Sequence, residues 1–295
     1  AAGLAVSATP GSNRCHYLSL PRAPRNHILF VRAPHLRPLS VILSEYHHIC
    51  ALLLNRQEAR WYDIDLGEIA QLETLTSNVP SRVREGGWQG YESKRIERHI
   101  DAHLHDHFKK AAQMTFDLFK KHPFEWLFLG LKEEYRSDFE ALLHPYLKER
   151  HIGWLKTNSN DSEDKVLKQA MEIENKLRME QEARLAQGLV AELESGGRAV
   201  SGIREVLRTL NAAEVQTLVV TRNLSLEGRV CPKCELLYLD ELQCPVCRVK
   251  TEKVQDIVHE SVHAAMDNKS QVRYVTSPSK LDRYGKIGAF LRYKK

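Results

Sequence analysis

The sequence predicts an α/β protein made of two α/β domains. Short apolar runs of strand length alternate with amphipathic helical segments along most of the 295 residues. A helix of about thirty residues follows a loop that contains two adjacent glycines, and a polar stretch at 157–164 separates two such α/β patterns. Apolar residues make up 42% of the chain, which is enough for two cores rather than one.

The domain borders follow from these breaks in pattern. We expect residues 1–25 to be a remnant or tail of an N-terminal domain, residues 26–157 to form a middle domain, and residues 158–295 to form a C-terminal α/β/α domain. The net charge of +5 permits an RNA partner without requiring one. No apolar run approaches the roughly 18 residues that span a bilayer, so we expect no membrane partner.

In the middle domain, the periodicity predicts a three-stranded meander, a long helix, and a return to strands. The expected elements are a helix at 39–46, strands at 49–54, 59–64 and 69–75, the long helix, a strand at 126–129, a helix at 132–143 and a strand at 151–155. In the long helix, apolar residues recur every three or four positions, which predicts one core-facing stripe. That stripe is Ile96, Ile100, Leu104, Phe108, Ala111, Thr115 and Leu118.

A second stripe on the long helix carries histidines. His99, His103 and His107 follow each other at four-residue intervals, between Arg95 and Lys110. Three imidazoles at this spacing could share a metal ion, but no carboxylate belongs to the stripe. We favour a basic, RNA-facing or merely solvated face over a metal site.

The C-terminal domain is expected to begin with a helix that runs from about 160 to 194 and stops at Gly196-Gly197. A helix at 201–210, a strand at 215–220, a helix at 253–266 and strands at 271–276 and 287–292 then complete an α/β/α sandwich.

Four of the six cysteines form the most specific motif in the chain. They are Cys231, Cys234, Cys244 and Cys247, in two Cys-Pro-x-Cys pairs that nine residues separate. Two such pairs predict a tetrahedral shell of four thiolates around a Zn²⁺ ion. That zinc would be structural, because four protein ligands leave no coordination position open. Two disulfides, a redox pair or four idle thiols are the alternatives. The ribbon at 229–250 interrupts the domain and is expected to contact a partner, and this cysteine usage is typical of a reducing cytoplasm.

Taken together, four segments resemble the archaeal and eukaryotic class-I peptide-chain release factors and their relative Pelota, particularly the bacterial branch of that superfamily. These segments are GGWQGYESKRIERHIDAHLHDHFKKAA at 86–112, SGGRAVSGIREVLRTLNAAEVQTLVV at 195–220, the cysteine insertion, and YGKIGAFLRY at 284–293. They follow the family's order over residues 26–295. The resemblance implies the family's middle domain followed by a C-terminal domain with the fold of kink-turn-binding ribosomal proteins.

The resemblance also implies a site. The family's glycine-glycine-glutamine loop positions a water for hydrolysis, which assigns Gly86, Gly87 and Gln89 as catalytic, although here Trp88 stands between the glycines and the glutamine. The RNA-contacting candidates are the residues around this loop. They are Arg82, Arg84, Trp88, Lys94, Arg95 and Arg98. From the resemblance, we expect the codon-reading domain to be absent or reduced to residues 1–25, so stop-codon reading is not expected.

The implied function is a ribosome-associated, release-factor-like protein that hydrolyses peptidyl-tRNA in termination or ribosome rescue. The alternative is a non-catalytic ribosome- or tRNA-binding factor of the Pelota type, which an exposed Trp88 stacking on an RNA base would favour. The implied partners are rRNA and tRNA, with a translational GTPase as a further candidate. A zinc-ribbon module unrelated to ribosomes would explain the cysteines but not the other three segments.

Overall fold

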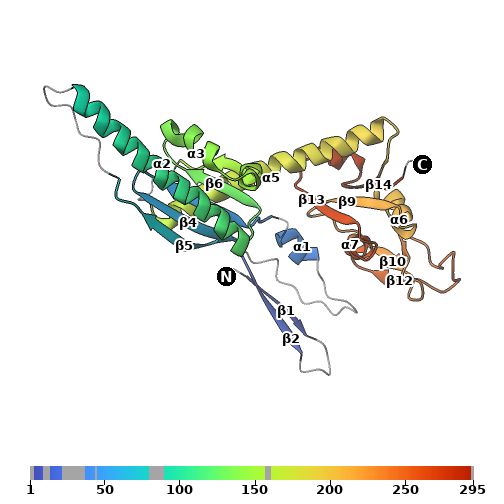
Figure 1. Ribbon diagram of the computed structural model, residues 1–295. Coiled ribbons are helices and arrows are strands. Elements are labelled where there is room, and N and C mark those ends of the chain that lie inside the picture. Colours follow the sequence, from blue (N-terminus) through green and yellow to red (C-terminus); the bar gives the residue numbers. More distant parts are fainter. Residues whose placement is uncertain are drawn as a thin grey trace. The chain divides into compact units, whose positions relative to one another are not determined.

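The computed structural model describes residues 3–8, 14–21, 37–43, 45–79, 90–156 and 161–293 (Figure 1). The chain divides into two compact units. The first contains Tyr46–Asn175, and the second combines Gly3–Glu45 with Lys176–Lys295. The division falls inside helix α5 (Glu163–Glu194). The domain borders drawn from the sequence stay a prediction.

The first unit contains a five-stranded sheet in the order β5-β4-β3-β6-β7. Its strands are β3 (Ile49–Leu54), β4 (Glu58–Asp65), β5 (Glu68–Thr76), β6 (Trp126–Gly130) and β7 (His151–Trp154). Strands β3, β4 and β5 form an antiparallel meander, whereas β3, β6 and β7 run parallel. Both β3 and β6 are buried along their whole length, as expected of central strands that are covered on both faces.

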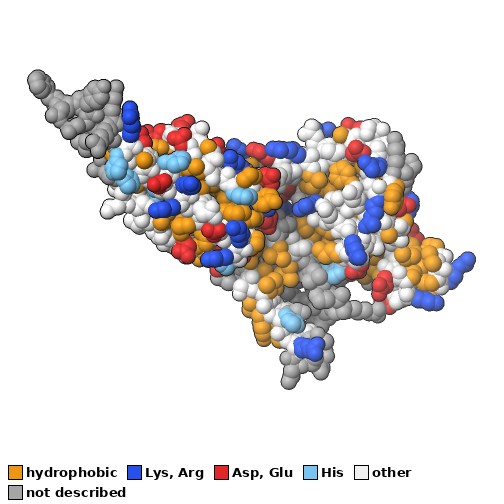
Figure 2. Space-filling model, viewed as in Figure 1, with side chains coloured by type: hydrophobic (Ala, Val, Ile, Leu, Met, Phe, Trp, Pro, Cys, Tyr) orange, Lys and Arg blue, Asp and Glu red, His pale blue; other side chains and the backbone are white. Residues whose placement is uncertain are grey.

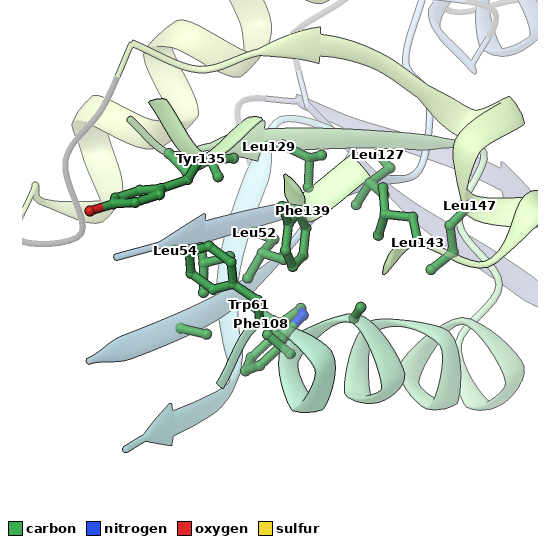
Figure 3. Close-up of a cluster of buried hydrophobic side chains, with 14 of the residues drawn as sticks. Leu52, Leu54, Trp61, Phe108, Leu127, Leu129, Tyr135, Phe139, Leu143 and Leu147 are labelled. Carbon is green, nitrogen blue, oxygen red and sulfur yellow. The ribbon is translucent and has the colours of Figure 1, made fainter. Parts of the chain in front are cut away.

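Helix α2 (Gly90–Lys121) packs its predicted apolar stripe against this sheet. From Ile100 onward the stripe is buried together with side chains of β3, β4 and β6, and Figure 3 shows the cluster between the sheet and α2. The predicted helix at 132–143 is divided into a 3₁₀ turn (Glu133–Tyr135) and α3 (Arg136–Leu142), and α4 (Pro145–Arg150) follows. Pro145 begins α4 because proline fits the first turn of a helix.

Two polar contacts tie α2 to the sheet from inside the core. The indole Nε1 of Trp61 donates a 2.9 Å hydrogen bond to Oγ1 of Thr115, which in turn donates to the carbonyl of Ala111. Nδ1 of His107 lies 2.7 Å from Oγ of Ser77. All of these partners except Ser77 are buried, so each contact satisfies a polar group that has left water.

The second unit contains a four-stranded sheet in the order β13-β9-β14-β8. Its strands are β8 (Ala199–Ser201), β9 (Val215–Thr221), β13 (Gln271–Val275) and β14 (Ile287–Leu291). Val219 packs in a cluster with Ala186 and Leu189 of α5. Its neighbours Leu218 and Val220 pack in a different cluster with α6 (Ile203–Asn211) and α7 (Ile257–Asp267). This alternation places helices on both faces, which confirms the predicted α/β/α layers.

Smaller elements complete the second unit. They are the hairpin β1 (Gly3–Ala8) and β2 (Cys15–Leu20), helix α1 (Arg37–Leu43), the three-stranded sheet of β10 (Gly228–Val230), β11 (Leu237–Tyr238) and β12 (Glu252–Val254), and a 3₁₀ turn (Lys280–Tyr284). The helix predicted at 253–266 is wrong at its start, because residues 253 and 254 belong to β12 and α7 begins only at Ile257. The side chain of Asp256 caps α7 by accepting a hydrogen bond from the amide of Val258. Among the described helices, none is long and apolar enough to cross a membrane.

Candidate functional site

The four predicted cysteines come together in two equivalent turns. In the first turn, the amide of Glu235 donates to the carbonyl of Cys231, and the amide of Cys231 donates to the carbonyl of Leu236. The second turn repeats this pattern with Cys244, Arg248 and Val249. The residue after each Cys-Pro-x-Cys has a positive φ, 58° at Glu235 and 61° at Arg248, which folds each pair of thiols to one side.

The sulfur atoms of this thiol cluster lie within 4.8 Å of one another. The measured Sγ–Sγ distances are 3.2 Å for Cys231–Cys247, 3.5 Å for Cys234–Cys244 and 3.8 Å for Cys234–Cys247. None of the cysteines in the described part of the chain is in a disulfide. Cys231 and Cys244 are buried, and the other two are half-buried.

Four thiolates at this separation repel one another strongly unless a cation lies between them. Burial raises the pKa of Cys234, with added contributions from the neighbouring thiols, to about 12. At Cys244 burial acts in the same direction, but the Tyr238 hydroxyl and the amides of Cys247 and Val246 outweigh it and lower the pKa to about 6. The arrangement can hold one metal ion with four sulfur ligands. It offers no further position for a substrate, so its role would be structural.

Two contacts around the thiol cluster were not predicted from the sequence. The hydroxyl of Tyr238 lies 3.2 Å from Sγ of Cys244. The side-chain amide of Asn211, the last residue of α6, pairs with both the amide and the carbonyl of Leu237. Outer contacts of this kind orient metal ligands. The spacing of the cysteines carries no signal for either residue, because both contacts depend on how the ribbon packs.

The glycine loop lies outside the described residues. This applies to Gly86, Gly87 and Gln89, and also to Arg82, Arg84 and Trp88. Lys94 and Arg95 belong to α2, but their side chains are outside the described part, and Arg98 is exposed. The predicted catalytic and RNA-binding roles therefore stay predictions.

In the helix that follows this loop, the described side chains are buried in the core from Ile100 onward. Ile100 is its first buried residue among the described side chains, ten positions after Gly90. At 1.5 Å per residue, that stretch is about 15 Å long. Figure 1 shows α2 beginning beyond the end of the sheet that it covers.

The histidine stripe divides into an exposed pair and a buried residue. His99 and His103 are exposed, and their Nε2 atoms are 3.1 Å apart. His107 is buried against Ser77, and burial lowers the pKa of its imidazole. The expectation of one solvated face is wrong at His107, because that side chain is buried. Among the described residues, no group of three or more possible metal ligands includes these histidines. Figure 2 shows histidine side chains and one basic group near the described start of this helix.

Comparisons with known proteins agree with this architecture. Residues 34–175 match the family described as bacterial archaeo-eukaryotic release factor family 10. Peptide chain release factor subunit 1 of Archaeoglobus fulgidus is 27% identical over 289 residues, covering 88% of this chain and 69% of the relative. The same protein of Methanocaldococcus jannaschii is 26% identical over 294 residues, with the same two coverages of 88% and 69%.

A solved structure supports the fold. The chain is similar to archaeal Pelota in a model of ribosome-bound Pelota and ABCE1, with a TM-score of 0.51 and 16% identity. The match covers 83% of this chain and 61% of that one, and likeness at this identity shows the fold alone. The family match over residues 34–175 and the similarity to release factor subunit 1 together support a place for this chain in the superfamily of archaeal and eukaryotic class-I release factors and Pelota.

Proposed function

We propose that this protein acts on the ribosome in the cytoplasm as a release-factor-like protein that hydrolyses peptidyl-tRNA in termination or ribosome rescue. The observation that carries this proposal is the extent of the similarity to release factor subunit 1, which spans 88% of the chain and therefore both compact units. tRNA would enter as part of the substrate. A translational GTPase is a further proposed partner.

The proposed chemistry is positional. Gly86 and Gly87 would let the backbone enter a narrow RNA cavity, and the amide of Gln89 would orient the attacking water. Helix α2 supports this role because its turns from Ile100 onward pack in the core of the first unit, and its backbone extends about 15 Å from Gly90 to that residue. A rigid helix of this kind can present a loop far from the domain that holds it.

The decisive experiment measures release of labelled peptide from stalled ribosome complexes. Gly86→Ala and Gly87→Ala should abolish release and leave ribosome co-sedimentation unchanged, because the added Cβ restricts the backbone. Gln89→Ala keeps the backbone amide and should cost less than Gln89→Pro, which removes that donor. If neither the wild type nor a Trp88 deletion releases peptide above background, the hydrolase proposal is wrong.

One feature of the sequence favours the alternative of a binding factor without hydrolysis. Trp88 separates the two glycines from Gln89, and deleting it would restore the register of the family's loop. A Pelota-like binder should sediment with ribosomes and release no peptide, and Trp88→Ala should weaken its binding if the ring stacks on a base. Base stacking on an aromatic side chain contributes roughly 1–3 kcal/mol.

The basic residues at the start of α2 are proposed to contact RNA phosphates. Replacing Lys94, Arg95 and Arg98 with Ala should weaken ribosome binding and reduce its salt dependence, by roughly 0.7–0.9 in the logarithmic slope for each lost contact. At Arg98 the replacement should change folding little, since that side chain is exposed. Equal affinity of the variant and the wild type at both 50 and 200 mM salt would rule out this role.

We also propose that the thiol cluster holds Zn²⁺. Zinc accepts a closed tetrahedral set of four thiolates, which is the donor set that the two Cys-Pro-x-Cys turns bring together. Protein purified without chelator should contain about one zinc per chain. Absence of zinc in elemental analysis of folded protein would contradict the assignment.

A further inference from the structure

The two exposed histidines of α2, His99 and His103, form a close pair. They are four residues apart in the helix, so they lie on the same side of it. Their Nε2 atoms are 3.1 Å apart. The ring centroids are 4.4 Å apart, with an angle of 84° between the ring planes. Since both side chains are exposed, a ligand can reach the pair from solvent.

The distance between the two nitrogens fits a shared metal ion. An imidazole nitrogen binds Zn²⁺ at about 2.0–2.1 Å. Two such ligands are therefore about 2.8–3.4 Å apart when the angle between them at the ion is that of octahedral or tetrahedral coordination. The observed 3.1 Å lies inside this range, so the pair needs little rearrangement to bind an ion.

A hydrogen bond between the two rings explains the same distance when no ion is bound. One neutral imidazole then donates from its Nε2, and the other accepts at its Nε2. An ion can replace the shared proton once the donor ring carries that proton on Nδ1 instead. This change of tautomer releases no proton from the protein, and it leaves a lone pair on each Nε2 for the ion.

The site has two protein ligands and not the three that the spacing of the stripe allows. His107 is buried, and its Nδ1 contacts Oγ of Ser77. In the described part of the chain, no set of three or more possible ligands includes the pair. Water or another small ligand would therefore fill the remaining coordination positions, in contrast to the closed shell of the thiol cluster.

A second pair at the same spacing lies in α7 and is not equivalent. His259 and His263 have ring centroids 4.6 Å apart at an angle of 82°, which is close to the arrangement in α2. His259 is buried, however, whereas both histidines of the α2 pair are exposed. An ion that keeps water ligands needs the exposed pair.

The donor atoms restrict the kind of ion. Imidazole suits zinc, copper and nickel, whereas Mg²⁺ and Ca²⁺ take oxygen ligands. We propose that His99 and His103 bind one divalent transition-metal ion through their Nε2 atoms. With two protein ligands the ion should exchange readily, unlike an ion held by the four thiols. This proposal does not depend on the proposed function.

The ion would cross-link one turn of α2 at the place where burial in the core begins. Ile100, the first buried residue among the described side chains of the helix, lies between the two histidines in the sequence. A ligand that binds the helical form and not the unwound form favours the helix by the factor 1 + [L]/Kd, which is about a hundred at a hundred times the Kd. Metal binding should therefore reduce opening of this turn.

The first test is a calorimetric titration of the full chain with Ni²⁺. We expect saturable binding with a Kd below about 1 mM. His99→Gln and His103→Gln should each weaken it at least about tenfold, because a single imidazole cannot chelate the ion. The matched control is His105→Gln, which removes an exposed histidine of the same helix outside the pair and should bind within twofold of the wild type. The thiol cluster is unchanged in all of these variants, so its own binding of Ni²⁺ does not affect the comparison.

The second test is hydrogen exchange with and without Ni²⁺. At about a hundred times the Kd, the amides of residues 99–103 should exchange up to about a hundredfold more slowly in the wild type and should not change in His103→Gln. Equal affinity of the wild type and His103→Gln would mean adventitious binding elsewhere, and the proposed site would be wrong. Binding that leaves the exchange of this turn unchanged would exclude a chelate across it, and absence of saturable binding would refute the site outright.

Discussion

Replacing Cys244 with Ser should unfold the cysteine ribbon and leave the first unit intact. Cys244 is buried in the thiol cluster, and its amide and carbonyl form the hydrogen bonds of the second turn. A serine hydroxyl is a poor substitute for a thiolate ligand, so the variant should lose the bound metal. The first unit shares none of these ligands, since they all belong to the second unit.

The size of the effect follows from what else holds the ribbon. Within residues 229–250, Leu237 is buried in the main core cluster of the second unit, and the partly buried Val230 and Leu239 pack against that cluster. Burying one such side chain contributes roughly 1.5–3 kcal/mol. Binding of a structural zinc contributes roughly 10–16 kcal/mol in zinc-finger peptides. The metal should therefore dominate the stability of the ribbon, because one buried and two partly buried apolar side chains contribute less than it does.

Hydrogen exchange measures this directly. The amides of Cys231, Glu235, Cys244 and Arg248 form the two turns, so they should be protected in the metal-bound protein. In the variant, and in wild type after chelation, they should exchange at least about a hundredfold faster, equivalent to roughly 2.7 kcal/mol. Peptides from α2 should not change. Cys15→Ser is the matched control, because Cys15 is exposed and outside the cluster.

Metal content has to be measured on the same samples. If elemental analysis shows that the metal is gone and the four amides stay protected, then packing and not the metal holds the ribbon. The reasoning from ligand geometry would then be refuted.

Three further substitutions test other parts of the structure. Thr115→Val should lower the free energy of unfolding in urea by roughly 1–3 kcal/mol, because it leaves the indole N–H of Trp61 buried without its acceptor. In the double variant Trp61→Phe/Thr115→Val, the loss of stability should be smaller than the sum of the losses in the two single variants. Arg222→Ala should cost the second unit roughly 3–5 kcal/mol, since it removes the guanidinium that pairs with the nearly buried carboxylates of Glu45 and Glu182, of which Glu182 keeps its contacts with Arg178 and the amide of Thr276. Arg204→Ala at an exposed pair should cost less than about 1 kcal/mol. Burial lowers the pKa of His107, so below about pH 6.5 the unfolded state binds more protons than the folded state. The free energy of unfolding should therefore fall as the pH drops through that value, by at most about 1.4 kcal/mol per pH unit. Between pH 7.5 and 5.5, His107→Gln should lose less stability than the wild type.

The sequence was most informative where a periodic pattern coincided with burial. Strands β3, β4 and β5 lie within about two residues of their predicted bounds, because each is a run of strand-forming residues between turn residues. The three-residue strands β8 and β12 were not predicted. Strands of three residues are too short for a recognisable alternation of apolar and polar residues. They form because β8 pairs with β14 and β12 pairs with β10.

Of the candidate site, the sequence found the four thiols and missed the role of His107. The error has a geometric cause. Four residues advance a helix by 400°, so a stripe at this spacing turns by about 40° at each step. From His99 to His107 the drift is about 80°, enough to carry the side chain from the exposed face into the contact with Ser77.

The two buried polar contacts of α2 bear on how its first turn is positioned. His107 and Thr115 are eight residues apart, about 12 Å along the helix, and they bind to different parts of the sheet through Ser77 and Trp61. Two separated contacts resist both rotation and sliding of the helix. Gly90 begins the helix about 25 Å before His107, so a tilt of 10° at the anchored part would move that end by about 4 Å.

Displacements of that size matter if the proposed function is positional, because a misplacement of about 1 Å can cost roughly a hundredfold in rate. Thr115→Val leaves every residue of the proposed loop unchanged. It should nevertheless lower peptide release by more than its effect on ribosome binding. If release is unchanged in a variant that is measurably less stable, the contact between Trp61 and Thr115 serves the core alone, and the position of the loop is set elsewhere.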